Sequence, residues 1–137
     1  ATRRRPIIED GVLCTYLIDQ YYARKMDVEP TGGDTHNLEW SLGDKGLEEL
    51  IGDVHEGIYL DRFLGGNSNQ TTGELSMGCA GRMIRNGQLA EPITEGNLAA
   101  NFGELWQNLG AVGNDPDPNG SSRCPTCVFE GIQISGS

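Results

Sequence analysis

The chain has 137 residues, 36% of them hydrophobic, and a net charge of −10 from 10 basic and 20 acidic side chains. This length fits one domain with its own hydrophobic core. A strongly negative surface repels phosphate backbones and anionic lipids, and no apolar run reaches the ~20 residues of a transmembrane helix. We therefore expect a single domain, residues 1–137, with no nucleic-acid and no membrane partner.

The four cysteines, at positions 14, 79, 124 and 127, are too sparse for a secreted disulfide scaffold. The first residues, ATRRRPIIED, lack the apolar core of a signal peptide. We expect a cytoplasmic protein with reduced thiols. The basic cluster Arg3-Arg4-Arg5 is interpreted as a solvated terminal segment or as a pairing strand.

The first part of the chain predicts a hairpin and a short helix. Asp10-Gly11 separates two apolar runs and suits a tight turn, because both positions tolerate positive φ. Residues 12–18 are almost continuously apolar, as in a buried strand, and residues 19–26 fit a short helix.

The middle of the chain predicts strand, helix, strand and loop. Residues 37–42 and 57–64 fit strands, and Asp44 is the expected cap of a helix between them. Residues 65–74 are polar and glycine-rich, which favours a loop. The apolar side chains of the helix recur at helical spacing: Leu47, Leu50, Ile51 and Val54.

Residues 75–93 predict a hairpin that turns at Asn86-Gly87, since this pair suits a type I′ turn. A second amphipathic helix should follow, then a loop over residues 110–123 and an alternating strand over residues 128–134. The apolar stripe of that helix comprises Leu98, Phe102, Leu105, Trp106 and Leu109. The whole order predicts an α+β fold with a mostly antiparallel, twisted or barrel-like sheet and two amphipathic helices.

Cys124 and Cys127 have the spacing of half a zinc site, but a structural zinc needs four ligands and no second pair is present. A thioredoxin-like redox pair has its first thiolate at a helix N-terminus, where amide dipoles lower its pKa, whereas a strand-like run follows here. Residues three apart on a strand face opposite sides. Cys127 should therefore pack as a small hydrophobe, with Cys124 toward the loop.

Other candidate ligands are isolated. His36 and His55 are 19 residues apart, too far for the two histidines of a zinc peptidase helix. We expect His36 to be a hydrogen-bonded strand residue and His55 to lie near a helix C-terminus. Asp115 and Asp117 do not fit an EF-hand, so their segment predicts a proline-stiffened turn. The residues alone give no complete active site.

Five segments in order resemble the C-terminal part of the TldD/PmbA family, and the resemblance runs nearly end to end. They are EDGVLCTYLIDQYYARKM, GGDTHNLEW, GELSMGCAGRMIRNGQLAEPITEGNLAANFGELW, VGNDPDP and RCPTCVFEGIQISG. The likeness is greater to the PmbA branch, also called TldE, through its ARK…HNL stretch, its Asn-Gly hairpin and its GND loop.

The resemblance implies a divided metallopeptidase. In the family, the TldD subunit is similar to a zinc peptidase, with a His-Glu-x-x-x-His helix in its N-terminal domain and a cysteine from the C-terminal domain as third ligand. The PmbA/TldE subunit lacks the histidine motif and is regarded as structural. Cys124 stands near the place of that thiolate, followed by Pro125-Thr126 where TldD-type segments carry Gly-Lys.

The resemblance also implies that residues 1–137 are a piece lacking the N-terminal domain. A hydrolytic zinc site needs three protein ligands, so Cys124 can act only as one ligand of a site completed elsewhere. We expect no cofactor in this chain, zinc in a full complex, and no hydrolysis by the chain alone.

Three functions are compatible with the sequence. The chain is an interaction domain of a PmbA/TldE-like subunit that binds a TldD-like subunit, a self-assembling piece that binds copies of itself through open strand edges, or half of a TldD-like zinc peptidase.

Overall fold

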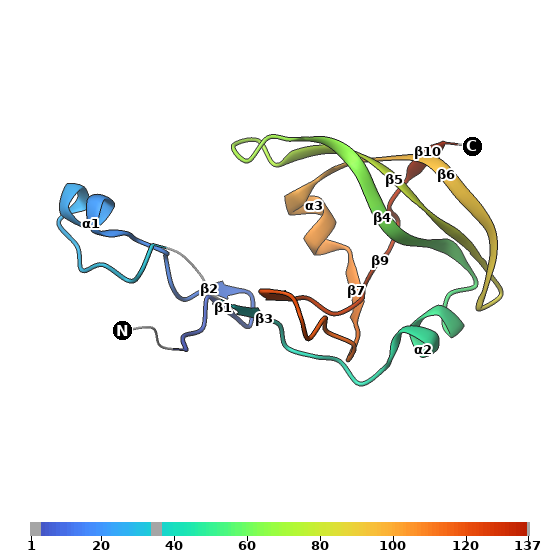
Figure 1. Cartoon of the computed structure of the whole chain (residues 1–137), viewed down its shortest axis with the longest axis horizontal. Helices are drawn as coiled ribbons and strands as arrows, with labels where there is room; N and C mark the ends of the chain where they lie inside the picture. The colour runs from blue at the N-terminus through green and yellow to red at the C-terminus, as the bar shows by residue number, and fades with distance from the viewer. Residues whose placement is uncertain (1–3, 34–36, 137) are drawn as a thin grey trace. The chain divides into compact units, whose positions relative to one another are not determined.

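The computed structural model describes residues 4–33 and 37–136. Its contacts divide the chain into two compact units, which we call the arm (residues 1–39 and 119–123) and the body (residues 40–118 and 124–137). Three helices and ten mostly antiparallel strands among the described residues confirm the α+β class, without a closed barrel (Figure 1).

The elements of the arm are β1 (Ile8–Glu9), β2 (Val12–Leu13), α1 (Gln20–Met26), β3 (Leu38–Glu39) and β8 (Ser122–Arg123). The elements of the body are α2 (Leu47–Gly52), β4 (Glu56–Ser68), β5 (Glu74–Arg85), β6 (Gln88–Asn101), α3 (Phe102–Gln107), β7 (Leu109–Val112), β9 (Cys127–Phe129) and β10 (Ile134–Gly136).

The body is built on a four-stranded antiparallel sheet in the order β10-β6-β5-β4. The hairpin between β5 and β6 turns at Asn86 and Gly87, whose φ angles of 50° and 76° confirm the predicted type I′ turn. The amides of these residues donate to the carbonyls of His55 and Val54, so the segment after α2 holds the turn.

The predicted loop over residues 65–74 is wrong, because β4 and β5 extend into it and leave a short turn at residues 69–73. Gly65 and Gly66 have φ angles of 119° and 158°, and a Cβ at Gly66 would overlap the Ser76 carbonyl oxygen. Glycine therefore lets the strands approach here, although composition alone indicated a break.

The predicted second amphipathic helix is also wrong in extent. Leu98 lies in β6 and pairs with Met77 of β5 and Ile134 of β10, and Leu109 begins β7. Only residues 102–107 are helical, capped by the Asn101 side chain, which accepts a hydrogen bond from the Gly103 amide at 2.9 Å. Pairing with two strands outweighs the helical spacing of the apolar residues.

The core of the body is small and centres on Leu75, Cys79 and Leu98. Cys79 is completely buried. A second cluster joins three aromatic rings: Trp106 stacks on Trp40 and meets Phe129 edge to face, each at a centroid distance of 5.4 Å.

Helix α2 buries Leu50 and exposes Glu48 and Glu49, as the sequence predicts. Its N-cap is Gly46 rather than Asp44, and the Gly46 amide donates to the Glu49 carboxylate at 2.9 Å. The helix ends at Gly52, so His55 lies beyond its C-terminus rather than within its last turn.

The predicted strand over residues 128–134 is two strands. β9 pairs with β7, whereas β10 pairs with β6. Gly131 between them has a φ of 67°, which interrupts the extended run.

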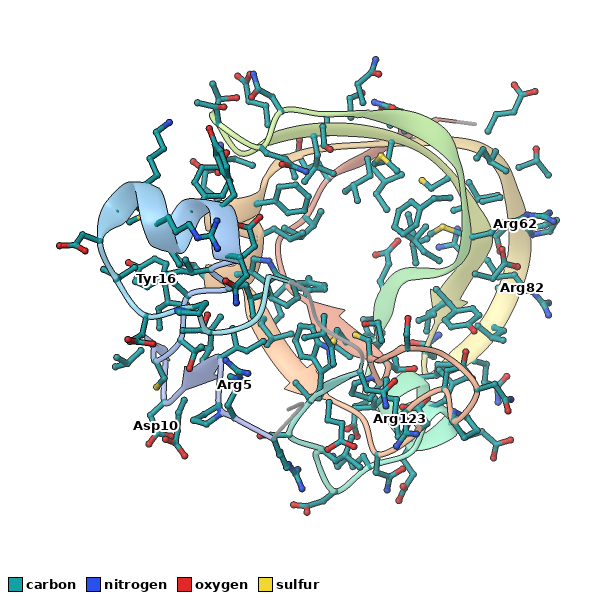
Figure 2. All side chains as sticks on the ribbon, turned by 60° about the vertical axis from the view of Figure 1, so that its left-hand side comes forward. Arg5, Asp10, Tyr16, Arg62, Arg82 and Arg123 are labelled. Carbon is teal, nitrogen blue, oxygen red and sulfur yellow. The ribbon has the colours of Figure 1, made fainter. Side chains whose placement is uncertain are left out.

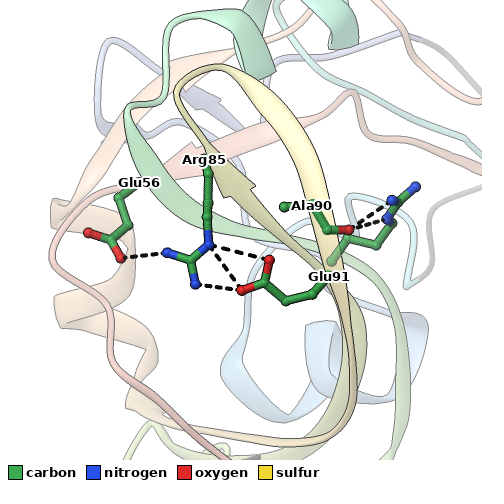
Figure 3. A network of polar contacts seen from close by, with 5 residues as sticks. Glu56, Arg85, Ala90 and Glu91 are labelled. Carbon is green, nitrogen blue, oxygen red and sulfur yellow. Dashed lines mark hydrogen bonds and ion pairs between the residues drawn. The ribbon is translucent and has the colours of Figure 1, made fainter.

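An ionic cluster lies at the turn end of the β5–β6 hairpin (Figure 3). The Arg85 guanidinium donates from Nε to Glu91 Oε1 at 3.0 Å and from Nη1 to Glu56 Oε1 at 3.4 Å. Arg82 donates to the Ala90 carbonyl at 2.8 Å and 3.0 Å. Because these side chains are exposed, the cluster helps to fix the register of β4, β5 and β6 more than it stabilises the fold.

The arm begins with the predicted hairpin, whose turn residues Asp10 and Gly11 have φ angles of 50° and 76°. The buried strand expected over residues 12–18 is wrong, since only Val12–Leu13 is a strand and both residues are exposed. The predicted short helix is confirmed as α1, where the Asp19 carboxylate accepts a hydrogen bond from the Tyr22 amide at 2.7 Å.

Of the N-terminal basic residues, the structure describes Arg4 and Arg5, neither of which lies in a strand, and the Arg4 side chain is 90% exposed, as in a solvated segment. Arg4 pairs with Glu39 at 3.0 Å, and Arg5 donates to the Thr31 carbonyl. Arg3 and His36 lie outside the described residues. No described helix is long and apolar enough to cross a membrane.

A candidate thiol site on three joined loops

Three loops of the body meet through their backbones. The Gly113 amide donates to the Thr126 carbonyl at 2.7 Å, and the Gly43 amide donates to the Gly113 carbonyl at 3.0 Å. The Asn114 amide donates to the Lys45 carbonyl at 2.9 Å, beside a parallel bridge between Lys45 and Gly113. We call these segments the loop node: residues 43–45, 113–115 and 124–127.

Two glycines allow this close approach. A Cβ at Gly43 would overlap the Val112 carbonyl oxygen, and a Cβ at Gly113 would lie 3.3 Å from the Thr126 carbonyl oxygen and overlap the Asp115 carboxylate. A larger residue at Gly43 would push the backbone of residue 112 away, whereas a larger residue at Gly113, the glycine of the GND stretch, would displace the Asp115 carboxylate.

Asp115 ties the cysteine-bearing loop to the node. Its carboxylate accepts hydrogen bonds from the Thr126 amide at 3.0 Å and from the Thr126 hydroxyl at 2.7 Å. Burial alone would raise the pKa of Asp115. The hydrogen bonds from Thr126 lower the pKa by more than burial raises it, so the pKa lies below its ordinary value of 3.8. The predicted turn over this segment thus has a specific partner, which spacing could not identify.

The two thiols flank this anchor. Cys124 donates from Sγ to the Pro125 carbonyl at 3.4 Å, and Cys127 donates to the same oxygen at 3.5 Å. Cys124 is exposed and Cys127 is half-buried, as expected. They do not face opposite sides of a strand, however, because β9 begins only at Cys127 and Cys124 lies in the loop before it.

Burial raises the pKa of Cys127 to about 11, and the neighbouring Cys124 and Asp115 raise it as well. The Cys127 thiol is therefore protonated at neutral pH. The arrangement presents one accessible sulfur and one protected sulfur beside each other.

Zinc does not fit the described part of this chain. No group of three or more His, Cys, Asp or Glu side chains that could hold a metal occurs within residues 4–33 and 37–136, whereas zinc sites use at least three protein ligands. His55 is not part of the loop node. Cys124 as one ligand of a site completed by another chain or domain stays a prediction.

Replacing Asp115 with asparagine should lower the free energy of unfolding at pH 7 by roughly 1 kcal/mol, because a hydrogen bond to a charged, partly exposed acceptor is weakened. Since the pKa of Asp115 is lowered by folding, its carboxylate stabilises the fold above the unfolded pKa, and this stabilisation is lost as pH falls through the folded pKa.

The measurement is urea unfolding of both chains from neutral pH down to about pH 3. The difference between wild type and Asp115→Asn should shrink as the pH falls. A difference that stays constant over this range would contradict the assigned role of the carboxylate.

Fold and site define a class: an α+β domain on an open antiparallel sheet, presenting a cysteine pair on a glycine-dependent loop node. The chain belongs to the PmbA/TldD family, since the family model for the PmbA/TldA metallopeptidase C-terminal domain matches residues 1–136. This confirms the resemblance inferred from the five segments.

Related proteins match the chain over nearly its whole length. It is 32% identical to the metalloprotease PmbA of Escherichia coli O157:H7 over 98% of this chain and 30% of that protein. A crystal structure of a proposed modulator of DNA gyrase from Bacteroides thetaiotaomicron VPI-5482 matches all of the chain and 31% of that protein, with 47% identity and a TM-score of 0.94.

The structure of TldE from Thermococcus kodakarensis, at 24% identity, shares the fold, with a TM-score of 0.85 over 98% of this chain and 34% of that protein. The chain therefore spans about a third of the length of the relatives it matches.

Proposed function

We propose that this chain is a non-catalytic association domain of a PmbA/TldE-like subunit, and that it binds a TldD-like subunit of a metallopeptidase. The observation that carries the proposal is the apolar surface of the arm. Ala23 is the only described arm residue with an apolar side chain that is buried. The large apolar side chains that the arm exposes are Ile8, Val12, Leu13, Tyr16, Leu17, Tyr21, Tyr22, Met26, Val28 and Leu38.

Such a surface favours a partner because covering apolar area contributes roughly 25 cal/mol per Å². Large exposed apolar patches mark interaction sites on folded proteins. Tyrosine is enriched at interfaces. The exposed Tyr16 belongs to the arm and follows, in the chain, the hairpin that carries Asp10 (Figure 2). The extent of the match supports the choice of branch, since PmbA and its homolog match 98% and 100% of this chain and a TldD homolog matches 80%.

The test is to mix the purified chain with a full-length TldD-type subunit and to measure complex formation by size exclusion with light scattering. We expect a stoichiometric complex. Tyr16→Glu should weaken binding about tenfold or more, because a charge replaces an apolar contact at the interface. The Tyr16 side chain is 69% exposed, so this substitution leaves the fold of the chain intact.

Leu64→Glu is the matched control, since Leu64 is 56% exposed but lies on β4 of the body. It should leave the complex unchanged. No complex over a wide concentration range, or equal weakening by both variants, would overturn the proposal.

Self-association is the second candidate, favoured by the open edge of the sheet. Among the described strands β4 pairs with β5 alone, and Phe63 and Leu64 on it are exposed. Such an edge can pair with another copy. If this candidate holds, the chain alone will form oligomers in the same light-scattering experiment, and Leu64→Glu rather than Tyr16→Glu will disperse them.

A further inference from the structure

The cysteine pair combines proximity with unequal access. The Sγ atoms of Cys124 and Cys127 lie 3.4 Å and 3.5 Å from one oxygen, the Pro125 carbonyl, so the two free thiols share one hydrogen-bond acceptor. The other two cysteines do not form such a pair. Cys14 is exposed and donates to the Val12 carbonyl, and Cys79 is completely buried.

The loop between the sulfurs is held in place. Pro125 has a fixed φ, and Thr126 is bound through its amide and hydroxyl to Asp115 and through its carbonyl to the Gly113 amide. Little conformational entropy therefore remains to be lost when a bond closes across this loop. The loop node holds the thiols together without a third ligand among the described residues that would direct them to a metal.

We propose that Cys124 and Cys127 are a thiol–disulfide exchange site that reacts with low-molecular-weight disulfides and closes to a reversible intrachain disulfide. Cys124 is the attacking residue because it is the more exposed of the two cysteines, and Cys127 is the resolving residue because it is half-buried and shares the Pro125 carbonyl with it. This proposal is independent of the proposed function, since it depends only on the loop node.

The exchange balances in two steps. The Cys124 thiolate attacks one sulfur of a disulfide RS–SR, which forms Cys124–S–S–R and releases one RS⁻ that takes up the proton lost by Cys124. Cys127, which is mostly protonated at neutral pH, reacts through its small thiolate fraction: its sulfur attacks the Cys124 sulfur, forms the intrachain disulfide and displaces the second RS⁻, which takes up the proton lost by Cys127. The two protein thiols are oxidised by two electrons, and the external disulfide is reduced to two thiols.

The test uses the whole chain, oxidised glutathione and mass spectrometry after rapid alkylation of free thiols. Cleavage after Arg123 places Cys124 and Cys127 in one terminal peptide, apart from Cys14 and Cys79. We expect this peptide to lose two hydrogen atoms and to carry no glutathione, and we expect dithiothreitol to reverse the change. Cys14 should carry glutathione, and Cys79 should stay unmodified.

Two variants separate the roles of the sulfurs. Cys127→Ser should accumulate glutathione on Cys124 to a level at least about tenfold above the wild type, because no resolving thiol remains. Cys14→Ser, the matched control, should leave closure of the pair unchanged. Persistent glutathione on wild-type Cys124 at the level of Cys127→Ser, or a bond from Cys124 to Cys14 or to another chain, would overturn the proposal.

Discussion

Replacing Gly81 with alanine should lower the free energy of unfolding by about 3 kcal/mol, the upper end of the usual cost of overpacking, because the contact is with rigid backbone. Gly81 lies in β5 against β4. A Cβ there would lie 2.9 Å from the Tyr59 carbonyl carbon and 3.0 Å from the Leu60 Cα, and it would overlap the Tyr59 carbonyl oxygen. Backbone cannot rotate away as a side chain can, so the strands must separate.

The measurement is thermal unfolding followed by circular dichroism, with an expected fall in Tm of roughly 10 °C. Gly52→Ala is the control, because a Cβ at Gly52 meets nothing within 4 Å at the end of α2. That change should be neutral or stabilising by up to about 1 kcal/mol, given the better helix propensity of alanine. Similar losses in the two variants would show that the β4–β5 contact is not the cause.

The sequence predicts structure best where the cause is local. Asn86-Gly87 and Asp10-Gly11 turn as expected, because each pair favours positive φ at both turn positions. The spacing in α2 likewise places Leu50 in the core. These features need no knowledge of distant segments.

The predictions are wrong where pairing with a strand that is distant in the sequence determines the local structure. Leu98 fits a helical stripe, yet β10, more than thirty residues later, pairs with it as a strand. Residues 65–66 suggest a loop, but their glycines allow β4 to approach β5 closely. The apolar run at residues 12–18 predicts a buried strand, but Val12, Leu13, Tyr16 and Leu17 of this run are exposed.

The candidate site shows the same division. The spacing of Cys124 and Cys127 is visible in the sequence, but it is compatible with a zinc half-site, a redox pair or a buried hydrophobe. Two contacts distinguish these alternatives. Both thiols donate to the Pro125 carbonyl, and Thr126 donates to Asp115, which lies eleven residues earlier in the chain. Because β9 begins at Cys127, the rule for strand faces does not apply to the pair.

Truncating Leu98 to alanine should lower the free energy of unfolding by about 2–3 kcal/mol, through lost burial and the cavity that remains. Leu98 is 6% exposed and belongs to the core cluster with Leu75 and Cys79. Because it also pairs with Ile134, the cavity should weaken β10 first, and hydrogen exchange should rise at the amides of this strand.

Leu89→Ala tests the same chemical change in the same strand, at a side chain that is 37% exposed near the hairpin turn. It should cost less than about 1 kcal/mol, because less apolar area leaves the core. The contrast between the two variants distinguishes the strand position of Leu98 in the structure from the helix position that its spacing predicted. If Leu98 faced solvent on a helix, both truncations would cost little and β10 would keep its protection. A loss confined to Leu98→Ala, with faster exchange at residues 134–136, requires the strand.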